Sequence, residues 1–210
     1  MNYIDIDSSQ HELYDSWRKL YTVSFPIFEQ RTQEQQEKAF SCADYHLVGY
    51  SEGDMFVGFI SYWEFGSYRY IEHFAVHQGL RGRGYGSEIL NAFLRSTSKI
   101  VLLEIDPIVD SVSRARLRFY RKCGFHENPF AHTHPPYREG YSPHSLVVLT
   151  SPRSFPYTTY TASRNTTGHG REEGNTHKEP RSKKMFEEHF SPLPLLIVDE
   201  IGGVPAGRGG

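Results

Sequence analysis

A glycine-rich segment with two arginines could bind an anion. It reads Arg81-Gly82-Arg83-Gly84-Tyr85-Gly86 and follows a β-like run that ends at Val76. Glycines adopt positive φ and, because they lack a Cβ, let the backbone approach a ligand closely. Their N–H groups can converge on an anion where a helix begins, and the two arginines would add side-chain charge there. The segment therefore predicts a diphosphate site.

The spacing within this segment differs from that of two common nucleotide-binding loops. The dinucleotide fingerprint has Gly-x-Gly-x-x-Gly early in a βαβ unit, and the P-loop needs Gly-Lys followed by Ser or Thr. This chain has Arg81-x-x-Gly84-x-Gly86 instead. Taken alone, the segment is also compatible with an Arg/Gly-rich surface loop or with a short RNA-binding box.

A second segment predicts a helix that carries a candidate proton donor. Apolar side chains recur at spacings of three and four, which predicts one apolar stripe made of Val112, Ala115, Phe119 and Cys123. Asp110 or Ser111 can cap the start of the helix, and Gly124 can end it. Tyr120 lies near that end, where its hydroxyl could give a proton to a leaving group or simply pack in the core.

The two segments together resemble the GNAT superfamily of acyl-CoA-dependent N-acetyltransferases. Residues 81–86 resemble its pyrophosphate loop, and Phe119-Tyr120-Arg121-Lys122-Cys123-Gly124-Phe125 resembles its Tyr-x-Lys-x-Gly-Phe helix end. The order of the motifs and their separation also fit. The resemblance covers roughly residues 1–150. It implies acetyl-CoA as the acyl donor and a primary amine, unidentified by the sequence, as the acceptor.

The resemblance also implies which residues would hold acetyl-CoA. In the family, the strand that ends at Val76 carries a bulge and separates from its neighbour, so that an N–H there can face the thioester carbonyl. The implied binding residues are Phe74, Ala75, Val76, Arg81, Gly82, Arg83, Gly84, Tyr85, Gly86, Ser87 and Ser113. At Ser113 and Arg116 the chain departs from the family, which often has Asn and Ala at these positions.

Direct transfer to an amine requires a base and an acid, but no nucleophilic cysteine. A lysine-like amine is mostly protonated at neutral pH and must lose a proton before it attacks. Glu72 is the first choice of base, because it shares a face with Phe74 in a regular strand. Glu104 is the second choice and His73 the third. Tyr120 stands at the position of the family's acid and is expected to protonate the departing thiolate.

Hydrophobic patterns place these residues in a mixed α/β fold. We expect a helix after a capping box at residues 9–12, then further helices at about 29–40, from 84 and over 111–123. Strands are expected at residues 45–50, 55–63, 68–76, 100–105 and 145–150. Strands joined both by hairpins and by helices imply a mixed, mostly antiparallel central sheet flanked by helices. The family that the chain resembles has this order of elements.

Residues 151–210 differ from the rest of the chain. They are polar or rich in Gly and Pro, and they show no apolar period that would predict a packed core. We therefore expect an acetyltransferase domain over residues 1–150 and an unstructured C-terminal tail over 151–210.

The overall composition gives no reason to expect nucleic acid or a membrane as a partner. The formal net charge is −2, which indicates neither nucleic acid nor an anionic membrane as a partner. No apolar run approaches the ~20 residues that span a bilayer, and no signal peptide is evident, so we expect a cytoplasmic protein. The sequence does not indicate an oligomeric state. A non-catalytic CoA-binding sensor of the same fold is the alternative function, and an RNA-associated protein is a weaker one.

The segment 126–144 is rich in histidine and proline. Its histidines at 126, 132, 134 and 144 are unevenly spaced and have no cysteine partners, so no metal site is expected. One interpretation is an ordered loop on the acceptor side, where Tyr137, Arg138 and Tyr141 could contact the substrate. The other is a plain connection between two elements.

Overall fold

The computed structural model describes residues 1–129, 132–134 and 136–151, which all lie in one compact unit, Met1–Arg153. The expected C-terminal tail, apart from Ser151, lies outside the described residues. Within the described part of the chain, no helix is long and apolar enough to cross a membrane.

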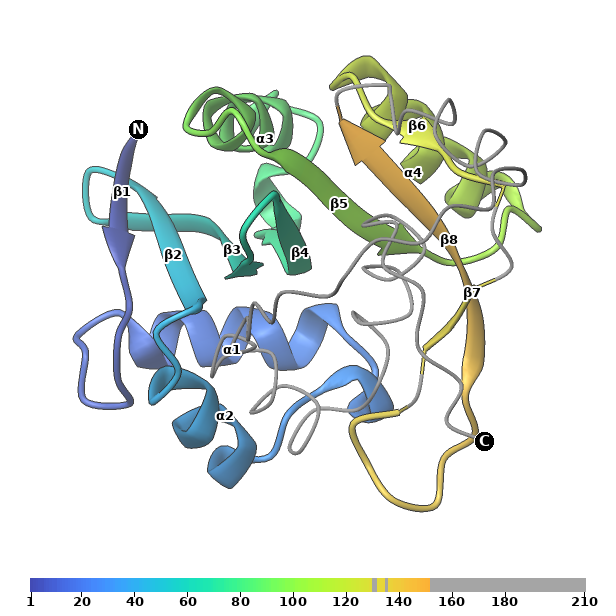
Figure 1. Cartoon of the computed structure of the whole chain (residues 1–210). Coiled ribbons are helices and arrows are strands. Elements are labelled where there is room, and N and C mark those ends of the chain that lie inside the picture. The colour runs from blue at the N-terminus through green and yellow to red at the C-terminus, as the bar shows by residue number, and fades with distance from the viewer. Residues whose placement is uncertain (130–131, 135, 152–210) are drawn as a thin grey trace, which may run out of the picture. The chain divides into compact units, whose positions relative to one another are not determined.

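A twisted sheet of eight strands forms the centre of the unit (Figure 1). The strands are β1 (Asn2–Asp5), β2 (Tyr45–Glu52), β3 (Met55–Glu64), β4 (Tyr68–Val76), β5 (Ile100–Ile105), β6 (His126–Glu127), β7 (His132–His134) and β8 (His144–Ser151). Their order is β1-β2-β3-β4-β5-β8-β6, with β7 paired to β8. Only the β4–β5 pair is parallel in this sheet. The predicted fold class, a mixed and mostly antiparallel sheet flanked by helices, is confirmed.

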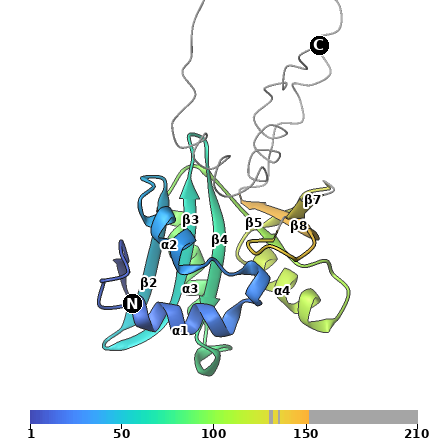
Figure 2. The ribbon, with the colours of Figure 1, turned by 90° about the horizontal axis from the view of Figure 1, so that it is seen from below.

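Two helices cover each face of the sheet. They are α1 (Tyr14–Ser24), α2 (Gln33–Phe40), α3 (Tyr85–Arg95) and α4 (Ser111–Lys122). Helices α1 and α2 lie on one face, against β2, β3 and β4, whereas α3 and α4 lie on the other, against β4 and β5 (Figure 2). A core of aliphatic and aromatic side chains fills the space between the sheet and α3 and α4, with Ile89, Leu90 and Phe125 almost fully buried. The parallel pair in the middle is therefore covered on both sides.

The first two helices begin later than their sequence predicted. Helix α1 starts at Tyr14 with no side-chain cap, so the predicted capping box at residues 9–12 is wrong. Helix α2 starts after Thr32, whose side chain forms a capping box with Gln35. Residues Ile27–Glu29 form a separate 3-10 turn after Pro26, instead of the start of a helix. This turn places Glu29 outside α2.

Candidate active site

A cleft of about 980 Å³ opens where β4 and β5 separate. The two strands pair in register from Tyr68↔Ile100 to Ile71↔Leu103, and no further. Strand β4 continues to Val76 beside β3 alone. The side of β4 that faced β5 therefore loses its strand partner from Glu72 onward, and its main-chain groups become available to a ligand.

A β-bulge lies at the point where this separation begins. On β4, His73 pairs with Ser61 and Ile71 pairs with Tyr62, so Glu72 is the additional residue. The bulge abolishes the usual alternation of side chains. Glu72 Oε2 lies 3.8 Å from His73 Nδ1, and both side chains are almost fully buried, although a regular strand would direct them to opposite faces.

The glycine loop forms one end of the cleft. Gly82 and Gly84 have φ of 79° and 92°, and a Cβ on either would meet open space, so glycine is needed there for its conformation and not for room. Gly84 caps α3 without any side-chain hydrogen bond. The first N–H groups of α3 therefore have no partner within the helix. Arg81, Gly82, Gly84, Gly86 and Ser87 all line the cleft.

Helix α4 forms the wall opposite β4. Three of the four residues in the predicted apolar stripe are not buried in the core. Val112 is 64% exposed, Ala115 is exposed and Phe119 is half-buried. These three side chains line the cleft. Ser113 and Leu117 are buried away from it, and Tyr120 is buried but also lines the cleft. Cys123 is buried as expected. Periodicity alone predicts an apolar face, and it does not distinguish a face that packs in the core from one that lines a cleft.

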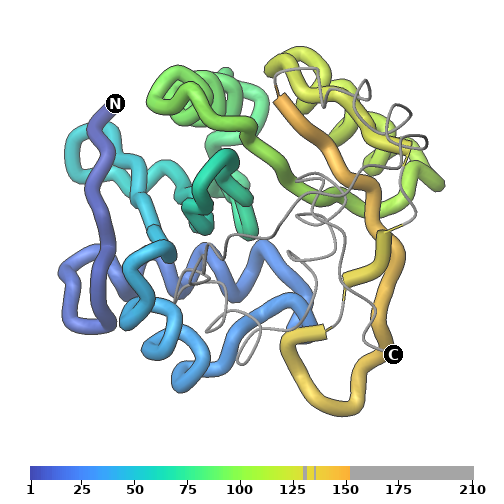
Figure 3. Tube along the Cα trace, viewed as in Figure 1, coloured from blue at the N-terminus to red at the C-terminus, as the bar shows by residue number. Residues whose placement is uncertain are grey.

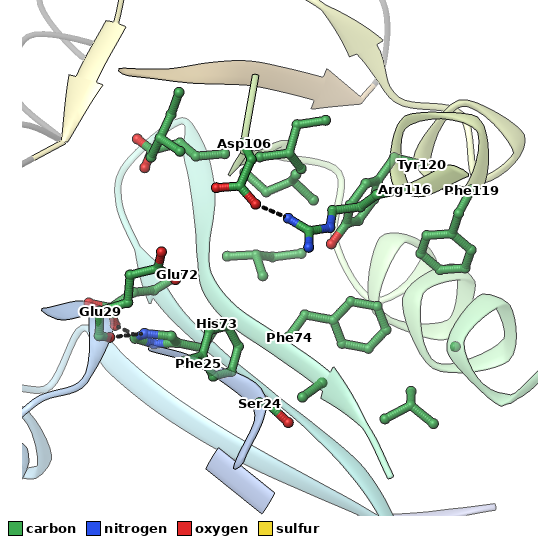
Figure 4. A pocket seen from close by; sticks show the side chains of 18 of the residues that line it. Ser24, Phe25, Glu29, Glu72, His73, Phe74, Asp106, Arg116, Phe119 and Tyr120 are labelled. Atoms are coloured by element: carbon green, nitrogen blue, oxygen red, sulfur yellow. Dashed lines mark hydrogen bonds and ion pairs between the residues drawn. The ribbon is translucent and has the colours of Figure 1, made fainter. Parts of the chain in front are cut away.

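Aromatic contact joins the two walls of the cleft. The rings of Phe74 and Phe119 are stacked with centroids 6.3 Å apart, and Figure 4 shows them facing each other between β4 and α4. A Cβ on Gly86 would lie 3.4 Å from the ring of Phe119. Arg118 and Lys122 of α4 also line this part of the cleft. The spacing of three residues between Phe119 and Lys122 could have placed Lys122 on this face from the sequence alone.

Tyr120 lies at the bottom of the cleft. It is 9% exposed and lines the cleft from α4. Burial raises the pKa of its hydroxyl to about 12, against a smaller lowering effect of the Arg116 guanidinium. The phenol is therefore protonated at neutral pH, as a proton donor must be.

Three other residues that were predicted to bind acetyl-CoA, Ser113, Tyr85 and Arg83, are not among the residues that line the cleft. The hydroxyl of Ser113 completes the capping box of α4 with Asp110 and accepts hydrogen bonds from the N–H groups of Val109 and Asp110, at 3.1 and 3.0 Å. It is buried within the helix start and does not line the cleft. Tyr85 donates a hydrogen bond to Glu52. Arg83 is exposed on the loop, beside the residues that line the cleft.

Glu72, the first choice of base, is held by three neighbours. It forms an ion pair with Arg31, and its carboxylate accepts hydrogen bonds from Trp63 Nε1 (3.1 Å) and from the Tyr137 hydroxyl. Its side chain is 3% exposed. Burial alone would raise the pKa of Glu72, but Arg31, assisted by His73 and Tyr137, holds it below its usual value. This arrangement favours an anchoring role over proton abstraction.

The second and third choices of base are also committed to partners. Glu104 accepts a hydrogen bond from the Tyr70 hydroxyl (3.1 Å), lies 2.7 Å from His132 Nε2 and is 7% exposed. His73 Nε2 lies 2.9 Å from the Glu29 carbonyl oxygen, which can only accept, so Nε2 carries the proton. Burial lowers the pKa of His73 to about 4, although Glu72 opposes this.

Glu29 is the carboxylate that the sequence analysis did not single out. It lines the cleft from the 3-10 turn and its side chain is 27% exposed. Burial is the largest cause that raises the pKa of Glu29 to about 7, and the Asp106 carboxylate adds to it. The signal available in the sequence was the capping box of Thr32 and Gln35, which starts α2 three residues after Glu29 and leaves Glu29 in the preceding turn.

The histidine-rich segment folds back onto the chain around Glu29. The Tyr137 N–H donates to the Phe28 carbonyl (2.9 Å), Gln35 donates to the Tyr137 carbonyl (3.1 Å), and Arg138 donates to the Gln30 carbonyl (2.9 Å). Figure 3 shows this yellow segment beside the blue one. His134, Tyr137 and His144 line the cleft. The position of these residues on the cleft is consistent with the interpretation of the segment as an acceptor-side loop.

Among the described residues, no group of three or more His, Cys, Asp or Glu side chains could hold a metal ion.

These features together are a cleft with a cationic, glycine-rich end, an open strand edge in the middle and a carboxylate-lined far end. The model of the acetyltransferase (GNAT) family matches residues 11–125, more than half of the chain. The chain belongs to the GNAT family of acetyltransferases. Within this GNAT chain, both motifs that carried the resemblance lie on the same cleft.

Similar proteins agree with this membership. The chain is 28% identical over 114 residues to the "Putative acetyltransferase YjbC" of Bacillus subtilis. That match covers 52% of this chain and 56% of the relative, so the chain spans little more than half of the relative's length. A solved structure named "Putative acetyltransferase from GNAT family" from Bacteroides thetaiotaomicron has a TM-score of 0.69 at 27% identity, covering 73% of this chain and 88% of that one.

Two further solved structures share the fold and were determined with CoA groups bound. A Bacillus subtilis acetyltransferase in complex with CoA has a TM-score of 0.52 at 15% identity, covering 71% of this chain and 96% of that one. Arabidopsis thaliana Naa50, in complex with the bisubstrate analogue CoA-Ac-MVNAL, has a TM-score of 0.52 at 21% identity, with the same coverage. At these identities the comparison concerns the fold alone.

Proposed function

We propose that residues 1–150 form an N-acetyltransferase domain, which transfers an acetyl group from acetyl-CoA to a primary amine by direct attack in a ternary complex. The observation that carries the proposal is the continuity of the cleft. One cavity joins the anion loop at Gly82–Ser87, the open edge of β4 and the buried hydroxyl of Tyr120 to the carboxylate-lined end at Glu29.

The residues at the loop end fit a CoA diphosphate. Gly86 and Ser87, in the first turn of α3 where the helix dipole is positive, line the cleft, and so do Arg81, Arg118 and Lys122. The free N–H groups of that turn and the three cations would bind the phosphates. The open edge of β4 would hold the pantetheine arm by main-chain hydrogen bonds. An N–H of Phe74, Ala75 or Val76 would stabilise the negative charge that develops on the thioester carbonyl oxygen.

Tyr120 would supply the proton for the departing sulfur. Its raised pKa keeps the phenol neutral until a thiolate forms nearby, and its place on α4 directs it into the cleft from the wall opposite β4. The acceptor would enter from the opposite end, between the 3-10 turn and the segment that carries Tyr137. Aromatic side chains line that end, including Phe25, Phe28 and Tyr70.

The proposal is tested by two measurements on the purified full chain. Titration calorimetry should detect saturable binding of acetyl-CoA, and Arg81→Ala should weaken it by about tenfold or more, because a charge-assisted hydrogen bond contributes about 1.5–3 kcal/mol. Arg95→Ala, which removes an exposed arginine at the far end of α3, should leave binding unchanged. A thiol-release assay over a panel of amines should then show turnover. Binding without turnover on any amine would favour the non-catalytic CoA sensor, and no binding would exclude both functions.

A further inference from the structure

Proton abstraction from the acceptor needs a carboxylate or imidazole that can reach the substrate. Four such groups come from β4, β5 and the 3-10 turn: Glu29, Glu72, His73 and Glu104. Three others also line the cleft. Asp106 is held in an ion pair with Arg116, the His134 side chain is only 13% exposed, and burial lowers the pKa of His144, which makes it a weaker base than an ordinary histidine. A general base must contact the proton that it removes, directly or through one water molecule, and must be free to change its charge. These two requirements separate the four groups.

Three of the four groups fail one requirement. The Glu72 and Glu104 side chains are 3% and 7% exposed. Glu72 is held by Arg31, Trp63 and Tyr137, and Glu104 accepts a hydrogen bond from Tyr70 and lies in ion-pair distance of His132. His73 is 4% exposed, its Nε2–H donates to a carbonyl, and its Nδ1 lies 3.3 Å from the Ser61 hydroxyl. A proton added to any of them would break an established hydrogen bond or ion pair.

Glu29 meets both requirements. Its side chain is 27% exposed, and His144 Nε2 lies 3.8 Å from its Oε1, which is too long for a hydrogen bond. Its main chain, in contrast, is held firmly, because the Glu29 carbonyl accepts from His73 Nε2 at 2.9 Å. Figure 4 shows Glu29 across the cleft from Tyr120, with the residues of β4 between them. The side chain is therefore presented to the cleft from a fixed backbone.

We propose that Glu29 is the general base that takes the proton from the acceptor amine, which rests on the proposed acetyl transfer. The Glu29 carboxylate removes one proton from the ammonium group, and the neutral amine forms the C–N bond as the C–S bond breaks. Tyr120 gives its proton to the sulfur and regains one from the nitrogen through solvent. In total, an ammonium and a thioester give an amide, a thiol and one proton, which Glu29 releases to solvent.

The charged surroundings of Glu29 suit this task. The titratable and charged groups that face it come from four elements: His73 on β4, Glu104 and Asp106 at the end of β5, Arg116 on α4 and His144 on β8. Asp106 is paired with Arg116, so that pair adds little net charge. With its pKa raised to about 7, Glu29 titrates near neutral pH and is a stronger base than an ordinary glutamate.

The test is the pH dependence of kcat/KM for an amine with a pKa near ~10, measured at saturating acetyl-CoA by thiol release. For the natural protein, kcat/KM should rise tenfold per pH unit up to about 7, the pKa of Glu29. It should then stay constant up to the pKa of the amine, above which the ammonium form of the substrate is lost. Glu29→Gln should lower kcat/KM by about 10²-fold at neutral pH. In Glu29→Gln only the free amine can react, so kcat/KM of this variant should keep rising with pH between about 7 and the pKa of the amine, where kcat/KM of the natural protein is constant. The difference in kcat/KM between the two proteins should therefore become smaller at high pH.

Controls separate this proposal from the function on which it rests. Glu29→Asp should keep a level region with a reduced rate, and Glu34→Gln, at an exposed position on α2, should match the natural protein. Acetyl-CoA affinity should be equal in all variants. If Glu29→Gln keeps both the rate and the level region, Glu29 is not the base although acetyl transfer stands. If the natural protein releases no thiol with any amine, acetyl transfer and the role of Glu29 both fall.

Discussion

Arg31 and Glu72 form an ion pair whose side chains are 1% and 3% exposed. The guanidinium also lies over the rings of Tyr45, Trp63 and Tyr137, 4.9–5.7 Å from their centroids. The pair joins the loop before α2 to the bulge of β4, and the Tyr137 hydroxyl adds the histidine-rich segment to the same point. The cleft wall around Glu29 is thus anchored by charges that are removed from solvent.

Removal of one partner of this pair should destabilise the fold strongly. Arg31→Met leaves the Glu72 carboxylate buried without its counter-charge, which should lower the free energy of unfolding by about 3–5 kcal/mol. The double variant Arg31→Met/Glu72→Gln removes both charges and should recover a large part of this loss. Urea denaturation of the natural protein and both variants measures the effect. An Arg31→Met protein with an unchanged midpoint would contradict this account.

His73 should make stability depend on pH. Its pKa is about 4 in the folded chain and ~6.5 when unfolded, so the unfolded state binds more protons between these values. Stability should therefore fall as pH drops from about 6.5 toward 4, by about 3 kcal/mol in total. His73→Gln should remove this part of the slope in denaturation curves recorded at several pH values. His126→Gln, which changes a histidine on the short strand β6, is the control and should show the same dependence of stability on pH as the natural protein. The prediction is refuted if His73→Gln also shows the same dependence as the natural protein.

Tyr120→Phe should lower turnover while sparing acetyl-CoA affinity. The substitution removes only the hydroxyl, which is expected to protonate the departing thiolate, and a general acid contributes about 10²-fold or more. Steady-state thiol release and calorimetry measure the two effects separately. Tyr50→Phe removes another buried hydroxyl, on β2 and away from the cleft, and should leave turnover unchanged. Equal turnover of Tyr120→Phe and the natural protein would exclude the acid role.

Gly58→Ala should disturb the open edge of β4 through its backbone. A Cβ on Gly58 would lie 2.5 Å from the Ala75 carbonyl oxygen, a contact that only a shift of β3 or β4 can relieve. We expect a loss of about 1–3 kcal/mol in unfolding free energy and weaker acetyl-CoA binding, because Ala75 lies on the proposed pantetheine edge. Gly66→Ala is the matched control, since its Cβ would meet nothing within 4 Å. Unaltered stability and affinity in Gly58→Ala would disprove the constraint.

The elements of the fold were predictable because they depend on neighbours within a few residues. The apolar and aromatic runs of β3 and β4, the glycines that start α3 and the stop of α4 at Gly124 are local patterns, and each predicted element is present. The short strands β1, β6 and β7 were not anticipated, because two to four residues carry too little periodicity. Both motifs lie on one cleft, which Arg81, Gly82, Gly84, Gly86 and Tyr120 line, and the roles of these residues stay predictions.

The roles of the carboxylates depended on contacts between distant residues. Regular alternation predicted Glu72 on the same face of the strand as Phe74, but the bulge of β4 changes the direction of its side chain. Its carboxylate forms an ion pair with Arg31, which lies far earlier in the chain. Glu29 gained its raised pKa from burial and from Asp106, which no local pattern links to it. Helical periodicity likewise identified the apolar face of α4, yet the separation of β4 from β5 determined that this face lines a cleft. Local propensity decides which elements form, whereas burial and charge pairing arise only when those elements pack together.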